Sequence, residues 1–112
     1  MKIAVSSIGM ALDSKMSETF GRCPYFIVAE TKGSDIMKTE LVENAGVDQK
    51  SGAGISAAEA IAEKGVKVVI TDNIGPRAAD IFKQFKIKVY EGKGTIREAI
   101  NKFTKGELKK II

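Results

Sequence analysis

Residues 65–90 read GVKVVITDNIGPRAADIFKQFKIKVY and contain two short apolar runs on either side of a helical pattern. The first run, Val66–Thr71, is rich in β-branched residues, which predicts a buried strand. Pro76 can occupy the first position of the following helix, because the N–H that proline lacks would have no partner there. Ile87–Tyr90 is then a second strand, and such a strand–helix–strand unit predicts two parallel strands. The residues expected on the inner face of the helix are Ala78, Phe82 and Phe85.

The flanking sequence extends this pattern in both directions. Thr95 and Glu98 form a capping box for a final helix, which Gly106 ends. The other expected elements are strands at Lys2–Ser6, Tyr25–Thr31 and Ile36–Glu43, and a helix at Ala53–Lys64 that Gly65 terminates. The order β-β-β-α-β-α-β-α predicts an α/β fold with a five-stranded mixed sheet, an antiparallel hairpin near the start and helices on both faces.

The composition excludes several classes of protein. The chain has 112 residues, 44% of them hydrophobic, which suits one globular domain spanning residues 1–112. It has no apolar run of the roughly 18 residues that a membrane span needs and no signal-peptide pattern, so the cytoplasm is the expected location. The net charge of +4 comes from scattered lysines, which favours a solvated surface over a nucleic-acid-binding face.

The chain contains no histidine and one cysteine. The absence of histidine removes the usual general base, the commonest zinc ligand and every Ser–His–Asp or Cys–His arrangement. We therefore expect a binding protein rather than an enzyme. The single cysteine excludes an internal disulfide and agrees with a reducing compartment.

Three loops are expected to meet at the carboxyl ends of the parallel strands, where ligands bind in open α/β sheets. The first is the long loop of residues 10–23, and the others are Gln49–Gly54 and Thr71–Arg77. Two of them place glycine at a helix start, where backbone N–H groups and the positive end of the helix dipole favour an anion. Simple helix capping is the alternative for either loop alone. The candidate ligand-binding residues are Phe20, Gly21, Arg22, Cys23, Ser51, Gly52, Ala53, Gly54, Asn73, Ile74, Gly75, Pro76 and Arg77.

Charged and soft side chains in these loops leave alternatives open. Arg77 lies in the first turn of a helix, against the dipole, so an anionic ligand or a carboxylate such as Asp72 should offset it. Cys23 is a candidate metal ligand or a small buried residue at the start of a strand. Asp13 and Asp72 could hold a hard metal ion, although a two-metal nuclease usually needs more acidic ligands.

Several motifs together resemble the dinitrogenase iron–molybdenum cofactor biosynthesis family. They are Phe20–Phe26, Gly52–Gly54, Ile74–Ala78 and Ile87–Tyr90 with Gly94-Thr95, and the similarity extends from Met1 to about Leu108. The resemblance implies a ribonuclease H-like three-layer α/β/α fold. It also implies a small carrier of an iron–sulfur or molybdenum-containing cluster.

This chain departs from the family pattern at two positions. Thr19 and Ser51 stand where family members often have histidine. If those histidines are cluster ligands, Cys23 is the only strong side-chain ligand left. The resemblance then implies that backbone donors, with Arg22 and Arg77 as counter-charges, supply the other contacts.

Two hypotheses of function follow. The first is a non-catalytic carrier of an anionic metal–sulfur cluster or its precursor, whose partners are cluster donor or acceptor proteins rather than nucleic acid or membrane. The second is a phosphoryl-ligand or other anion-binding enzyme or sensor that uses the same cleft, with Asp13 or Asp72 binding Mg²⁺. A plainer alternative is an interaction module that is dimeric through its edge strand, and the sequence leaves both monomer and homodimer open.

Overall fold

One mixed sheet forms the centre of the structure, a computed structural model that describes residues 1–44, 46–48 and 50–112. Two positions of the expected polar stretch before the first helix, Ala45 and Gln49, lie outside the described residues. The strands are β1 (Lys2–Ser7), β2 (Tyr25–Lys32), β3 (Asp35–Glu43), β4 (Val68–Thr71), β5 (Lys88–Glu91) and β6 (Lys109–Lys110). The helices are α1 (Ala53–Ala62), α2 (Pro76–Gln84) and α3 (Ile96–Thr104).

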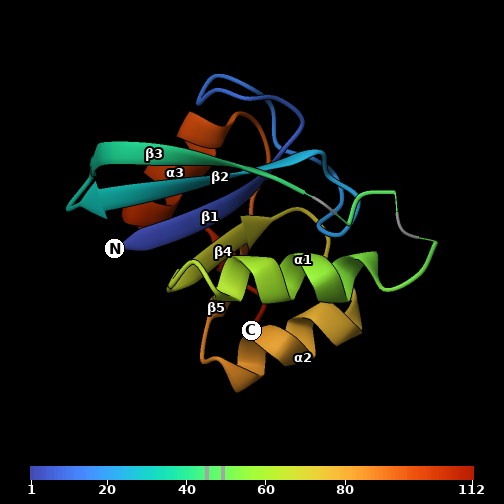
Figure 1. The fold of residues 1–112 in the computed structure, drawn as a ribbon. Helices are drawn as coiled ribbons and strands as arrows, with labels where there is room; N and C mark the ends of the chain where they lie inside the picture. The colour runs from blue at the N-terminus through green and yellow to red at the C-terminus, as the bar shows by residue number, and fades with distance from the viewer. Residues whose placement is uncertain (45, 49) are drawn as a thin grey trace.

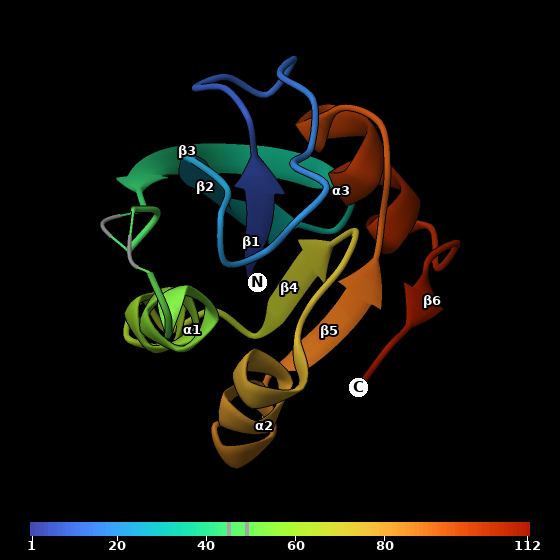
Figure 2. The same cartoon turned by 90° about the vertical axis from the view of Figure 1, so that its right-hand side faces the viewer.

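The sheet has the strand order β3-β2-β1-β4-β5-β6 (Figures 1 and 2). β1, β4 and β5 are parallel neighbours, as the helical crossovers require. β2 is antiparallel to both β1 and β3, so the predicted early hairpin is present. No helix formed by the described residues is long and apolar enough to cross a membrane.

The prediction of five strands is wrong, because β6 adds a sixth strand antiparallel to β5. In this pair Lys110 lies opposite Tyr90 and Lys109 lies opposite Glu91. The strand is two residues long and both of its side chains are exposed. It therefore carries no apolar alternation, and only the β5 edge beside it makes it a strand.

Alternation along the strands divides the core between the two faces of the sheet (Figure 2). On one face Ala4 and Val69 pack with α1 and α2, while on the other Val5 and Ile70 pack with α3. Phe82 of α2 is fully buried, with its ring edge-on to that of Phe20 at a centroid distance of 5.3 Å. The expected helical layers on both faces are therefore present.

Helix ends follow the sequence signals with one exception. The capping box of α3 is confirmed, because Thr95 Oγ1 accepts from the Glu98 N–H and Glu98 Oε1 accepts from the Thr95 N–H, each at 3.1 Å. Gly65 adopts the positive φ expected of a helix-ending glycine. The prediction that Phe85 points inward is wrong. It caps the end of α2, where the chain leaves helical geometry, and its side chain is 59% exposed.

The two phenylalanines near the end of α2 provide a test of this packing. Phe82→Ala should lower the free energy of unfolding by about 3–5 kcal/mol, because it opens a cavity between α2 and the sheet. Phe85→Ala is the matched control and should cost less than about 0.5 kcal/mol. Urea unfolding followed by circular dichroism measures both, and equal losses would contradict the assignment of the core.

A candidate anion-binding cleft

The amino-terminal ends of α1 and α2 open onto one cleft of about 250 Å³. Both helices begin at the same end of the molecule, beside the loop that follows β1 (Figure 1). The cleft is lined by Phe20, Gly21, Gly52, Gly54, Ile55, Gly75, Pro76, Arg77 and Ala78. The three loops that were expected to converge therefore do so.

Close backbone approach holds the first loop against α1. A Cβ atom on Gly21 would lie 2.8 Å from the Cα and N of Gly54, closer than side-chain carbons approach backbone. A hydrogen bond of 3.0 Å from the Phe20 N–H to the carbonyl of Asn73 ties the same loop to the segment before α2. Gly21 is thus required by packing.

The two helix starts differ in whether the structure requires glycine there. Gly52 has a φ of 75°, which favours glycine on conformational grounds. Gly75 has an ordinary extended conformation, and a Cβ atom there would meet nothing within 4 Å. Neither backbone conformation nor packing requires glycine at position 75, which lines the cleft.

The backbone donors at the starts of α1 and α2 have no acceptor within the described part of the chain. They are the N–H groups of Ala53, Gly54 and Ile55 in α1 and of Arg77 and Ala78 in α2. Neither helix has a side-chain cap or an acidic residue in its first turn. Such a helix start carries a partial positive charge and is suited to bind an anion.

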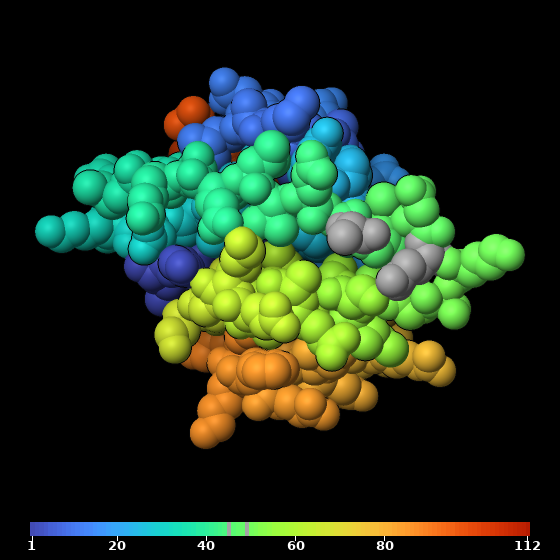
Figure 3. Space-filling model, in the orientation of Figure 1, coloured from blue at the N-terminus to red at the C-terminus, as the bar shows by residue number. Residues whose placement is uncertain are grey.

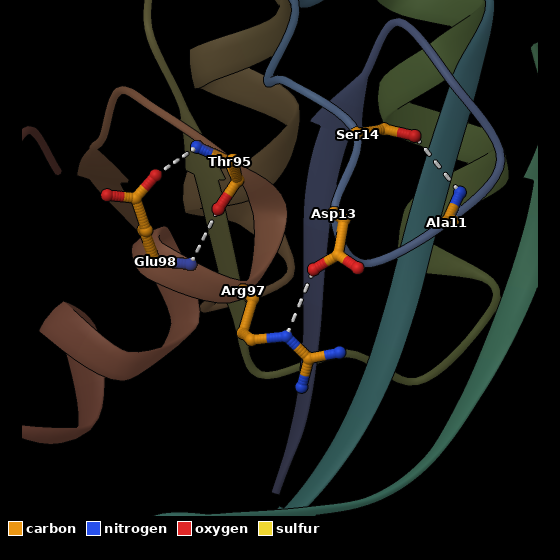
Figure 4. Close-up of polar contacts among 6 residues, drawn as sticks. All are labelled: Ala11, Asp13, Ser14, Thr95, Arg97 and Glu98. Carbon is orange, nitrogen blue, oxygen red and sulfur yellow. Dashed lines mark hydrogen bonds and ion pairs between the residues drawn. The ribbon is translucent and has the colours of Figure 1, made fainter.

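The third helix, α3, shows what a closed helix start looks like in this protein (Figure 4). The N–H groups of Ile96 and Arg97 donate to the carbonyls of Ser14 and Leu12, both at 2.9 Å. The Glu98 N–H donates to Thr95 Oγ1 in the capping box. The first donors of α3 are therefore satisfied internally, unlike those of α1 and α2.

Arg77 lines the cleft and is exposed. It makes no ion pair with any residue of the part of the chain that the structure describes. Asp72, the carboxylate proposed to offset it, lines a separate hollow with Glu91 and the lysines of β6. An anion in the cleft would therefore supply the negative counter-charge that Arg77 lacks among the described residues.

Arg22 does not line the cleft. Its Nη1 donates to the Val47 carbonyl at 3.0 Å and its Nη2 to the Lys50 carbonyl at 3.3 Å, so it holds the chain that leads into α1. Asn44, which the sequence analysis missed, supports the same region. Its buried amide donates to the carbonyls of Gly21 and Cys23 at 3.0 and 2.8 Å. The only sequence signal for Asn44 is an amide directly after a strand.

The other predicted site residues lie around the cleft rather than in it. Ser51 and the Asn73 side chain are exposed, Ala53 is buried at the start of α1, and Ile74 packs against the core. Ile55 also lines the cleft, although it is not among the candidate residues of the sequence analysis. Its position in the first turn of α1 was the available signal.

Cys23 is a core residue in this structure. Its side chain is fully buried, and the Sγ–H donates to the Phe20 carbonyl at 3.1 Å. Burial raises the pKa of the thiol from its ordinary 9.0 to about 12, although neighbouring backbone groups and Asn44 lower it slightly. A metal ligand must be a thiolate, so this geometry favours the core alternative for Cys23.

The two acids considered for a hard metal ion lie apart from the cleft. Asp13 forms an ion pair with Arg97 at 3.3 Å beside α3 (Figure 4), and Asp72 lies in the hollow next to β6. Among the described residues, no group of three or more Cys, Asp and Glu side chains is arranged to hold a metal ion. The cleft thus offers backbone donors and Arg77 rather than a carboxylate site.

The sequence profile of the family described as dinitrogenase iron-molybdenum cofactor matches residues 1–106. The chain belongs to this family. The resemblance drawn from the sequence motifs is thereby confirmed. An uncharacterised protein of Methanocaldococcus jannaschii is 37% identical over 98% of this chain and 95% of its own length.

Solved structures place this family member among small proteins of similar length. The apo form of the orange protein from Desulfovibrio gigas has a TM-score of 0.90 and 33% identity, covering 97% of this chain and 91% of that one. A NifB-like protein from Thermotoga has a TM-score of 0.84 and 33% identity, covering 98% of this chain and 92% of that one. The fold is therefore shared over nearly the whole chain.

The two cleft glycines at positions 21 and 75 should respond differently to an added methyl group. Gly21→Ala should lower the free energy of unfolding by about 1–3 kcal/mol, because the backbone of Gly54 must move. Gly75→Ala, the control, should cost less than about 1 kcal/mol, as expected for alanine at an N-cap position in open space. Chemical unfolding checks both, and a harmless Gly21→Ala would contradict the close contact.

The thiol of Cys23 should be protected in the folded protein. At pH 8 a thiol with a pKa of about 12 is almost entirely protonated, and the buried sulfur is out of reach of a disulfide reagent. We expect reaction with Ellman's reagent to be slow in native protein and complete within the mixing time in guanidinium chloride. Rapid stoichiometric labelling of native protein would show instead that Cys23 reaches the surface.

Proposed function

We propose that this protein binds an anionic metal–sulfur cluster, iron–sulfur or molybdenum-containing, or a precursor of one, in the cleft between α1 and α2. It then carries the cluster without transforming it. The observation that carries this proposal is that two uncapped helix starts and Arg77 face one cleft. Membership of the dinitrogenase iron-molybdenum cofactor family supports the same kind of cargo.

The electrostatics of the cleft favour an anion of more than one charge. Each helix start contributes the equivalent of about half a positive charge, and Arg77 adds a full one. Among the described residues, no carboxylate lines the cleft to oppose them. Because the partial charges of the two helix starts are fixed by the backbone, they need little reorganisation when the anion binds.

The walls of the cleft favour a large, weakly hydrated anion over a phosphate. Phe20, Ile55, Pro76 and Ala78 line the cleft together with the backbone donors. A phosphate loses strong hydration when it enters such an apolar environment, whereas the sulfides of a cluster are weaker hydrogen-bond acceptors that lose less. Hydrogen bonds to the sulfurs of iron–sulfur clusters are one way in which proteins set the reduction potential of the cluster.

The mode of binding in this proposal is electrostatic rather than covalent. Thr19 and Ser51 supply no imidazole, and both side chains are exposed outside the cleft lining. Cys23 lies in the core. The cluster would be held by the N–H groups of α1 and α2 and by Arg77. This mode suits a carrier, because cargo without covalent attachment can be passed on to an acceptor protein.

The same arrangement gives less support to an enzyme or sensor for phosphoryl ligands. Mg²⁺ in such sites is usually held by one or two carboxylates in addition to the phosphates, and neither Asp13 nor Asp72 lines the cleft. The remaining parts of the proposal are the cytoplasm as the location, cluster donor and acceptor proteins as partners, and a ribonuclease H-like classification of the fold.

Two arginines at equivalent helix positions provide the test. Each is the second residue of its helix, but Arg77 faces the cleft and Arg97 is paired with Asp13 beside a closed helix start. Arg77→Ala should weaken the binding of tetrathiomolybdate by about tenfold or more, since hydrogen bonds to charged groups contribute about 1.5–3 kcal/mol. Arg97→Ala should leave the affinity unchanged. Anaerobic titration followed by visible absorption measures both.

Two results would contradict the proposal. Equal affinity of wild type and Arg77→Ala would remove the cleft as the site. Loss of binding in a folded Cys23→Ser variant would show that the thiolate is a ligand and that the electrostatic mode is wrong. Titration with phosphate alongside tetrathiomolybdate separates the two classes of anion, and tighter binding of phosphate would favour the enzyme or sensor hypothesis.

A further inference from the structure

The strand β3 is a long open edge of the sheet. It lies at one end of the sheet and, within the described residues, pairs only with β2. Of its nine residues, only Ile36 and Val42 are even partly buried. Figure 3 shows the β2–β3 hairpin, in teal, projecting from the body of the molecule. An edge of this length presents a row of unpaired backbone groups that can pair with another strand.

The edge strand carries two exposed apolar side chains, of which Met37 is 63% exposed and Leu41 is 41% exposed. A β-bulge at Met37, between the pairs Glu30–Lys38 and Thr31–Ile36, interrupts the alternation of side chains. The regular ladder that contains Leu41 therefore begins at Lys38. Leu41 lies opposite Ile27 of β2, which belongs to the α3 side of the sheet. The α3 layer therefore leaves apolar surface uncovered at this edge.

The face of β3 that Leu41 does not occupy carries opposite charges two residues apart. Lys38 forms an ion pair with Glu30 of β2 at 3.1 Å. Glu40 forms one with Lys64, which follows α1, at 2.6 Å. Each charge is anchored by a partner on its inner side, and both remain largely exposed. Charges on an edge strand normally discourage pairing with other chains, so their spacing decides which pairings are tolerated.

We propose that two copies of this chain associate through β3, antiparallel, with Thr39 of each copy on the two-fold axis. In this register Lys38 of one copy lies opposite Glu40 of the other. This pair occurs twice by symmetry. The sheets of the two copies then form one continuous sheet.

The charges select this register over its neighbours. A two-fold axis perpendicular to the sheet keeps each face continuous only if the register changes in steps of two residues. Moving the axis from Thr39 to Lys38 places the two copies of Lys38 opposite each other. Moving it to Glu40 places the two copies of Glu40 opposite each other. Like charges directly opposite are destabilising. The regular pairing is confined to the residues around Thr39, because the bulge at Met37 interrupts the ladder.

Across the axis the two internal ion pairs join into a chain of alternating charge. Glu30 and Lys38 of one copy continue into Glu40 and Lys64 of the second. Networks of this kind contribute more than isolated surface pairs. An edge-strand contact is small, so we expect a reversible, concentration-dependent dimer at the low end of interface sizes. The inference is independent of the proposed cargo.

Disulfide trapping tests the position of the axis. In an antiparallel pair the Cα atoms of directly opposite residues lie roughly 4.5–5.5 Å apart, within the range of a disulfide. Thr39→Cys should therefore form a covalent dimer rapidly under mild oxidation. Leu41→Cys, on the same face of the same strand, is the control. Its two copies would lie four residues apart, or about 13 Å, and should cross-link at least about tenfold more slowly. Equal rates would overturn the proposal.

Charge reversal tests the register in the absence of a covalent link. Lys38→Glu and Glu40→Lys should each weaken dimerisation by roughly tenfold in sedimentation equilibrium. The double variant, Lys38→Glu with Glu40→Lys, should restore it, because the opposed charges are again complementary. Circular dichroism confirms that each variant is folded. A wild-type protein that stays monomeric at millimolar concentration, or a double variant that is no better than either single one, would overturn the proposal.

Discussion

The parallel pairing of β1 with β4 is the constraint on which the candidate site depends. Val5 lies opposite Ile70 in this pair, and both strands end at the same edge of the sheet. The loop after β1 and the segment that leads into α2 must therefore leave the sheet side by side. The hydrogen bond from the Phe20 N–H to the Asn73 carbonyl then joins them. The pairing of these parallel strands thus positions the cleft, whatever side chains line it.

Local packing then decides which helix starts stay open. The close contact of Gly21 with Gly54 brings the first loop onto α1, whose first N–H groups have no acceptor among the described residues. At α3 the chain does the opposite, because the carbonyls of Leu12 and Ser14 and the side chain of Thr95 occupy all of the first donors. The same fold therefore contains closed and open helix starts, and the open ones share a cleft with Arg77.

These features explain how a chain with no histidine and a buried cysteine can have a binding site. Backbone N–H groups do not depend on side-chain chemistry and carry no proton to transfer at neutral pH. In the proposed site they would bind an anion by hydrogen bonds without proton transfer, which suits the proposed carrier. The edge strand β3 is a separate feature of the molecule, with alternating charges and an exposed methionine and leucine. It is separated from β4 by β2 and β1 in the sheet.

The sequence by itself determined the order of helices and strands, the hairpin, the capping box of α3 and the convergence of three loops, because these follow from short-range periodicity and from the geometry of parallel strands. Membership of the family could also be read from the motifs. Only the tertiary structure decided that Cys23 is buried, that Arg22 holds carbonyls of the chain before α1 rather than a ligand, and that β6 completes the sheet. Those outcomes depend on long-range neighbours. A two-residue strand exists only because β5 offers it an edge. The loop cysteine is held by hydrogen bonds from its thiol to the Phe20 carbonyl and from the Asn44 amide to its own carbonyl.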